Sequence, residues 1–212
     1  SEAGPSVASM RAPLTTILGV YNRTFFDLVA RPEIRSLNDL RGKPIGISRY
    51  GASTEYAVRF ALKANNIDPD KDVKLLAVGA GTDAARISAL EAGVVAAAVL
   101  QVPSNLIAHK LGHKTILPLG EYMETLFAGL GTSQKKIQTN REEVKQVVRA
   151  VLKSLDFMAR NPVESKTIIQ KNLRGMESTA VEYIYDLVVK HATRNGIASQ
   201  KALDNTLLGS PF

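Results

Sequence analysis

The stretch SRYGAST, residues 48–54, combines the residue types of an anion-binding loop. An apolar run (44–48) precedes it and a helix is expected after it (53–65), so the first backbone N–H groups of that helix have no intrahelical acceptor. The helix dipole adds partial positive charge at the same end. The loop therefore predicts a pocket for a small anionic or polar group. Its members are Ser48, Arg49, Tyr50, Gly51, Ala52, Ser53 and Thr54.

The chemistry of this loop depends on its small and hydroxyl residues. Gly51 and Ala52 allow a ligand to approach the backbone, while Ser53 and Thr54 offer hydroxyl donors and Arg49 a positive charge. A second interpretation stays open, in which Ser53 only caps the helix and the small residues only permit a tight turn.

Three further polar residues are candidates for contact with the same ligand. Gln101 follows a strand expected over 94–100, and ligands of open α/β sheets bind at the carboxyl ends of the strands. Asn22 and Arg23 lie in a turn expected at residues 21–23, where a guanidinium can face a cleft. The alternatives are an ordinary surface loop around Gln101 and a solvated turn at Asn22 and Arg23.

Two other patterns match a dinucleotide-binding motif and a metal-binding motif only in part. The segment VGAGTDA (78–84) matches the dinucleotide pattern G-x-G-x-x-A, but the next strand ends at Leu100-Gln101 without the ribose-binding acid. Gly79 and Gly81 are therefore interpreted as a tight turn. His109 and His113 have i, i+4 spacing, but the H-E-x-x-H pattern is absent, so neither a metal site nor a catalytic site is expected.

The composition narrows the class of protein. The net charge is +7 with a pI near 9.6, but the basic residues are scattered and Trp is absent, so no nucleic-acid partner is expected. Cysteine is absent too, which excludes disulfides and thiolate metal sites within this sequence. No apolar run reaches the roughly 18 residues that a membrane helix requires.

Apolar runs alternate with helical segments from Lys43 to Leu119. This alternation is typical of successive βαβ units, which form a mostly parallel sheet with helices on its faces. We therefore expect one α/β lobe over 43–120. Its strands are expected over 44–48, 73–79, 94–100 and 114–119, and its helices over 53–65, 83–92 and 103–111.

The flanking segments predict a second lobe. Two strands are expected within 12–30 and one over 125–133, and we expect them to pair as two chain crossings with the tail helices around them. Residues 1–42 then form part of lobe 1 and a crossing, 43–120 form lobe 2, and 121–212 return to lobe 1. Lobe 1 has few strands for its helices, which indicates truncation at its amino-terminal side. The tail helices are expected over 140–159, 162–172, 178–194 and 199–207.

Several short motifs occur in a specific order: Asp39-Leu40-Arg41-Gly42-Lys43 before a strand, Gly51 to Thr54 at a helix start, Asp68-Pro69 before Asp72-Val73, and Ala89-Leu90 with Gly93. As a set they resemble the ABC-transporter substrate-binding proteins of the nitrate, sulfonate and taurine group (NMT1/THI5-like). The resemblance runs from about Leu14 to the tail helices. Ala96 departs from the family, which often has Asp there.

The resemblance implies a type II periplasmic-binding-protein fold, with two α/β lobes joined by a hinge. It places the family's second-lobe ligand loop on residues 48–54 and the next cleft-edge loop on Gln101 to Pro103. Members of the family normally begin with further strands and helices of lobe 1, and this sequence starts after them.

The expected function is that of the extracytoplasmic solute-binding component of an ABC importer. It would close on a small anionic or polar solute (nitrate, sulfonate, taurine or carboxylate-like) without chemistry or a cofactor. The expected partners are the solute and the ABC permease membrane subunits; the chain is expected to be a periplasmic or cell-surface anchored monomer. Two alternatives stay open: the effector-binding domain of a LysR-type transcription regulator, and a protein of thiamine-pyrimidine synthesis.

Overall fold

The computed structural model describes residues 14–79, 82–173 and 175–208 and divides them into two units. The first unit contains Thr24–Glu124; the second combines the strand before it with residues 125–207. The sequence placed the corresponding boundaries after residues 42 and 120. The difference arises because the segment 24–42 contributes a strand to the first unit. In the described part of the chain, no helix has both the length and the apolar character to cross a membrane.

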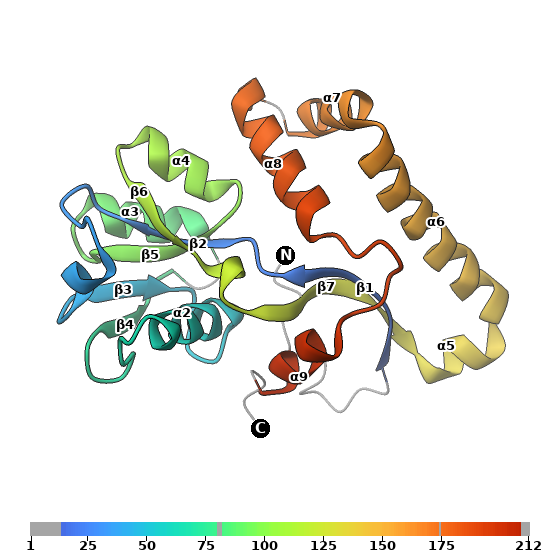
Figure 1. Ribbon diagram of the computed structural model, residues 1–212, viewed down its shortest axis with the longest axis horizontal. Helices are drawn as coiled ribbons and strands as arrows, with labels where there is room; N and C mark the ends of the chain where they lie inside the picture. Colours follow the sequence, from blue (N-terminus) through green and yellow to red (C-terminus); the bar gives the residue numbers. More distant parts are fainter. Residues whose placement is uncertain (1–13, 80–81, 174, 209–212) are drawn as a thin grey trace. The chain divides into compact units, whose positions relative to one another are not determined.

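A five-stranded sheet forms the centre of the first unit, with the order β4-β3-β5-β2-β6 (Figure 1). Neighbouring strands β3, β4 and β5 are parallel, as predicted. Helices α3 (Asp83–Glu91) and α4 (Ser104–Lys110) cover one face, and α2 (Ser53–Ala64) covers the other. The strands are β2 (Phe26–Ala30), β3 (Pro44–Ile47), β4 (Lys74–Ala77), β5 (Ala97–Gln101) and β6 (Lys114–Pro118), with short 3-10 turns η1 (Leu37–Leu40) and η2 (Leu119–Glu121).

Strand β2 corrects the predicted topology. The sequence assigned both strands within 12–30 to the crossings, but β2 lies between β5 and β6 and is antiparallel to both. Every residue of β2 is buried, which a central strand requires. The prediction of a turn at Tyr21-Asn22-Arg23 is wrong as well, because β1 (Leu14–Arg23) continues through these residues.

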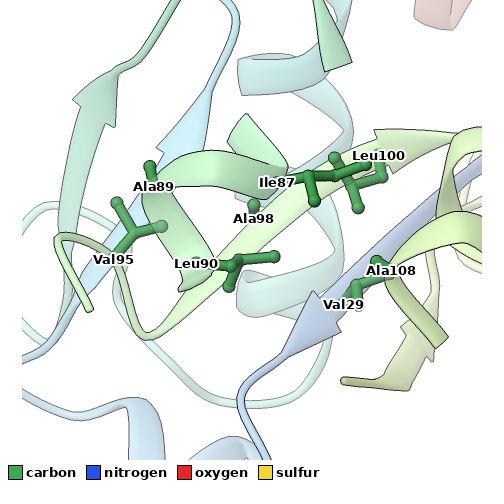
Figure 2. Packing of buried hydrophobic residues seen from close by; sticks show 8 residues of the cluster. All are labelled: Val29, Ile87, Ala89, Leu90, Val95, Ala98, Leu100 and Ala108. Carbon is green, nitrogen blue, oxygen red and sulfur yellow. The ribbon is translucent and has the colours of Figure 1, made fainter. Parts of the chain in front are cut away.

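The core of the first unit lies between this sheet and its helices. Figure 2 shows Ile87 and Leu90 of α3 packed against Ala98 and Leu100 of β5. Leu90, Ala98 and Leu100 are fully buried. This packing fixes α3 on the sheet, and thereby the position at which the α3 amino terminus meets the end of β5. The whole cluster comprises Val29, Ile87, Ala89, Leu90, Val95, Ala98, Leu100 and Ala108.

The described residues of the second unit form a two-stranded ribbon and five helices. β1 pairs with β7 (Glu124–Ser133), as expected of the two crossings. The helices are α5 (Gln134–Thr139), α6 (Arg141–Arg160), α7 (Pro162–Asn172), α8 (Ser178–His191) and α9 (Gln200–Leu208). Four of them were predicted; α5 was missed, and its amino terminus is capped by Ser133 Oγ, which accepts a hydrogen bond from Lys136 N over 3.1 Å.

Candidate functional site

The predicted ligand loop and Gln101 lie at the same edge of the sheet. Strands β3 and β5 are parallel, with Ile45 opposite Ala97 and Gly46 opposite Ala98. The chain leaves β3 at Ser48, and β5 ends at Gln101, so both residues stand at the carboxyl edge. In open α/β sheets, ligands bind beyond this edge.

The buried hydroxyl groups of Ser48 and Thr54 join the two ends of the loop. The Ser48 amide donates to Thr54 Oγ1 over 3.1 Å, and the Ser48 and Thr54 hydroxyls are hydrogen-bonded at 2.9 Å. Their exposed fractions are 1% and 2%. The part of Ser48 and Thr54 in ligand binding stays a prediction, because the structure uses both hydroxyls to join the start of α2 to the end of β3.

The start of α2 contradicts the interpretation in which Ser53 caps the helix. The N-cap residue is Ala52, whose extended backbone (φ −95°, ψ 164°) ends at Ser53, so Ser53 is the first helical residue and not the cap. No side chain caps the first turn. The amides of Ser53 and Thr54 therefore point out of the helix end without an intrahelical acceptor, as anion binding requires.

A carboxylate of the protein itself already occupies part of this helix end. Gly51 has φ +73°, and its amide donates to Glu55 Oε2 over 2.6 Å. The other oxygen, Glu55 Oε1, accepts from Arg59 Nε over 2.8 Å. Because Glu55 takes the Gly51 amide and the Arg49 carbonyl oxygen accepts from the Ala52 amide, a ligand would be left with the amides of Ser53 and Thr54 and with the exposed side chains of the loop.

Those exposed side chains are Arg49 and Tyr50. Tyr50 is 60% exposed, and its hydroxyl donates to the Leu75 carbonyl oxygen over 3.0 Å, so the side chain reaches back to the amino-terminal half of β4. Arg49 is exposed as well. The loop thus offers a ligand one guanidinium and one aromatic ring, together with the half-buried Ser53 hydroxyl.

Beside Gln101 lies a charged cluster that the sequence analysis missed. Asp83 accepts from the Gln101 amide over 2.9 Å and forms an ion pair with Arg86. Arg86, which is 2% exposed, also donates from Nε to the Val99 carbonyl oxygen over 2.8 Å, and its Nη1 has no hydrogen-bond partner. Arg86 therefore ties the first turn of α3 to β5 just before the predicted cleft-edge residue, whose side chain is exposed.

The second βα turn is tight, as predicted. Gly79 has φ +61°, and a Cβ there would lie 2.1 Å from the Ala85 Cβ. Only glycine fits this turn. Gly81, the other glycine of the predicted pattern, lies outside the described residues.

Asn22 and Arg23 belong to the second unit, at the end of β1. Both are half-buried, and Asn22 Oδ1 is buried without a hydrogen-bond partner. A strand end with an unsatisfied amide oxygen keeps Asn22 a candidate ligand residue. The role of both residues stays a prediction.

The histidines lie at the opposite edge of the first unit. β6 begins at Lys114, which stands opposite Ala30, and Ala30 also stands opposite Ala97 at the start of β5. His113 precedes β6 and contacts Glu91, while His109 Nε2 is hydrogen-bonded to Thr115 Oγ1 at 2.8 Å. Neither imidazole is therefore at the carboxyl edge with residues 48–54.

A surface hollow beyond the carboxyl end of α2 is also remote from the loop. Its acidic side chains are engaged: Asp70 binds Arg59 Nη1 over 2.6 Å and Asp72 binds Arg41 Nη1 over 2.6 Å. The hydrogen bond from Arg59 holds the pKa of Asp70 below its ordinary value. We therefore assign this hollow to surface ion pairs.

Comparisons with known proteins agree on the family and the fold. A sequence model of the family described as NMT1/THI5 like matches residues 7–165. The riboflavin-binding protein RibY of Chloroflexus aurantiacus is 29% identical over 156 residues, which are 72% of this chain and 43% of RibY. The chain thus spans less than half the length of this curated relative.

Two solved structures share the fold at low identity. The alkanesulfonate-binding protein SsuA from Xanthomonas axonopodis pv. citri superposes with a TM-score of 0.73 at 16% identity, over 95% of this chain and 68% of SsuA. The desulfurization enzyme DSZB superposes with a TM-score of 0.65 at 16% identity, over 93% of this chain and 72% of DSZB. The fold is that of the type II periplasmic binding proteins, as predicted. Since it also carries an enzyme, fold alone does not separate binding from catalysis.

Proposed function

The chain belongs to the NMT1/THI5-like family, and from this premise we propose that it is the solute-binding component of an ABC importer for a small anionic or polar organic solute. It would act outside the cytoplasm, in the periplasm or anchored at the cell surface, and deliver its solute to the permease subunits. The solute-binding names of RibY and SsuA support this role.

One observation carries the proposal: the uncapped start of α2 at the carboxyl edge of the sheet. There the outward amides of Ser53 and Thr54, the exposed Arg49 and the nearby Gln101 converge on the edge where α/β sheets bind ligands. All are hydrogen-bond donors, which suit sulfonate, carboxylate or nitrate oxygens. The exposed Tyr50 ring adds an apolar surface that would favour an organic solute.

The position of the histidines favours binding over catalysis. A protein of thiamine-pyrimidine synthesis, the second alternative from the sequence, should need a histidine and a metal near the cleft. His109 and His113 lie at the other edge, and the described residues contain no group of three or more potential metal ligands of the His, Cys, Asp and Glu types. The two carboxylates closest to the proposed donors, Glu55 and Asp83, are ion-paired with Arg59 and Arg86.

A thermal-shift screen of the whole chain tests the proposal. The panel contains nitrate, sulfate, taurine, alkyl and aryl sulfonates, carboxylates, a pyrimidine and riboflavin. A solute at a hundredfold its Kd stabilises the fold by about 2.7 kcal/mol. Arg49→Ala should abolish the shift, whereas Arg35→Ala should leave it unchanged, because Arg35 is an equally exposed arginine of the same unit at the amino edge of the sheet.

The outcomes of this screen separate the classes of function. A selective shift that depends on Arg49 supports a solute-binding protein and identifies its solute class. A solute that is consumed in the assay would identify an enzyme. A shift that Arg49→Ala and Arg35→Ala affect equally would overturn the assignment of the site to residues 48–54.

A further inference from the structure

The net positive charge of the chain is concentrated in its second unit. The sequence of this unit, residues 7–23 and 125–207, contains 15 lysines and arginines and 8 aspartates and glutamates, whereas the first unit contains 12 of each kind. The net charge of +7 is therefore carried by the second unit alone. A charge asymmetry between two parts of a chain indicates interaction with a nucleic acid or with a membrane surface.

Helix α6 brings together basic residues that are scattered in the sequence. Five of its 20 residues are basic, and all five are exposed. Four of them follow one another at intervals of four residues, and each such step turns only about 40° around the helix axis. The fifth, seven residues later, falls on the same side. All five lie within about 120° of the circumference. They are named here the α6 basic face: Arg141, Lys145, Arg149, Lys153 and Arg160.

The acidic residues of α6 leave this face positively charged. Each of the three has its own ion-pair partner: Glu142 with Lys145, Glu143 with Lys136 of α5, and Asp156 with Arg160. Within the part of the chain that the structure describes, Arg141, Arg149 and Lys153 have no ion-pair partner. The hydrogen bond from Lys145 lowers the pKa of Glu142. Arg149 and Arg141 lower it further through their charges, as expected of a face with positive potential.

The length of the α6 basic face fits an extended partner. A helix of 20 residues is about 30 Å long, and the basic residues run from its first residue to its last (Figure 1). A small solute could contact only one or two of them at once. A plane of anionic headgroups can contact all five, because the long stems of lysine and arginine let their charged ends reach a common surface.

The surroundings of the charges favour a membrane over a nucleic acid or an acidic protein. Single-stranded nucleic acids are bound with aromatic side chains, and the one aromatic residue of α6, Phe157, lies about 40° outside the arc of the basic face. Protein interfaces have an apolar centre, and no large exposed apolar side chain of α6 falls within this arc. A face that offers only dispersed positive charge suits the anionic surface of a bilayer.

We propose that the α6 basic face docks the second unit on the anionic headgroups of a lipid bilayer. The contact is electrostatic and reversible, and the helix lies on the surface without entering the hydrocarbon region. The proposal goes beyond the proposed function, because it concerns what holds the chain near a membrane and not which solute the first unit binds. Each basic residue close to such a surface strengthens binding about fivefold.

Co-sedimentation of the whole chain with lipid vesicles is the first part of the test. One set of vesicles contains equal parts of phosphatidylglycerol and phosphatidylcholine, and the other contains phosphatidylcholine alone. At low salt the chain should bind the anionic vesicles at least tenfold more strongly than the neutral ones. In about 1 M salt this preference should disappear, because the Debye length falls to about 3 Å.

The second part locates the contact by charge reversal. Arg149→Glu together with Lys153→Glu should weaken binding to the anionic vesicles at least tenfold. The matched control is Arg35→Glu together with Lys74→Glu, which changes the net charge by the same amount at two exposed positions of the first unit and should weaken binding less than threefold. Arg149→Lys with Lys153→Arg should retain binding, because a bilayer surface responds to charge and not to the geometry of the guanidinium group. Thermal unfolding confirms that each variant is folded.

Three results would contradict the proposal. The first is equal binding to anionic and neutral vesicles, and the second is equal weakening by the α6 variant and the control, which would assign binding to net charge alone. The third is displacement of the chain from the anionic vesicles by a short duplex DNA at equal phosphate concentration, which would identify a nucleic acid as the partner of this face. No solute enters this experiment, so it can succeed where the solute screen fails, and the reverse.

Discussion

Replacement of Thr54 by valine tests whether the Thr54 hydroxyl stabilises the fold of residues 48–54 or contacts the ligand. The methyl group of valine keeps the branched shape but removes the hydroxyl that Ser48 uses twice, through its amide at 3.1 Å and its hydroxyl at 2.9 Å. Both residues are buried, so water does not replace the lost partner. A buried donor left unpaired costs about 1–3 kcal/mol. We expect Thr54→Val to lower the free energy of unfolding by about 2 kcal/mol.

Urea unfolding followed by far-UV circular dichroism measures this change, since the chain contains no Trp. With a slope of about 2 kcal/mol/M, the midpoint of the transition of the first unit should fall by about 1 M at an unchanged slope. Ser53→Ala is the matched control. Its hydroxyl is half-buried at the next position, and its loss should change the free energy of unfolding by no more than about 0.5 kcal/mol.

Equal stability of Thr54→Val and the unsubstituted chain would refute the assignment of this hydroxyl to the fold. Loss of solute binding at equal stability would place Thr54 in the pocket instead. The reverse pattern, a lower midpoint with binding retained below the transition, would leave Ser53 and Arg49 as the side chains of the loop that contact the solute.

Three further substitutions test other parts of the first unit. Gly51→Ala should cost about 1–2 kcal/mol in urea unfolding, because φ is +73° there; no loss would show that the loop relaxes. Arg86→Met should cost about 3 kcal/mol, since it removes the ion-pair partner of half-buried Asp83 and the donor to the Val99 carbonyl oxygen; a neutral result would contradict the anchoring of α3. Burial raises the pKa of Asp27, so its charge reduces stability increasingly as pH rises from about 4 through that raised pKa. The free energy of unfolding of Asp27→Asn should therefore increase relative to that of the unsubstituted chain over this pH range, as measured by urea unfolding at several pH values. A difference between the two that is the same at every pH would refute a raised pKa of Asp27.

The parallel part of the first unit could be predicted from the sequence because local patterns determine it. Each apolar run between residues 44 and 100 is followed by a helix, and right-handed βαβ connections leave few arrangements for such units. Strand β2 could not be placed in the same way. Its sequence FDLVA contains an aspartate, and its partners β5 and β6 are about 70 to 90 residues away, so nothing local distinguishes a central antiparallel strand from a crossing.

The sequence predicted the sheet edge that Ser48 and Gln101 share, but not the local structure of residues 48–54. Parallel strands bring Ser48 and Gln101 to one edge whatever their side chains do, so the edge followed from the alternation of strands and helices alone. The N-cap residue of α2 could not be predicted from the sequence. Ala52 and Ser53 are both small, and a shift of the helix start by one residue decides which of them is the N-cap and which is the first helical residue. The Glu55 carboxylate on the Gly51 amide depends on that same register.

For the two polar residues that the structure turns inward, the sequence did contain a usable signal. The buried stripe of α2 includes Ala57, Val58 and Ala61. Thr54 lies three residues before Ala57 and four before Val58, whereas Ser53 has such a spacing to Ala57 but not to Val58. In α3, the same step back from Leu90 reaches Arg86. A polar side chain on the buried stripe of a helix must form hydrogen bonds within the protein, because burial without a hydrogen-bond partner lowers the free energy of unfolding. Periodicity therefore identifies the Thr54 hydroxyl and the Arg86 guanidinium as groups that stabilise the fold, while the ligand roles of Ser53 and Arg49 stay predictions.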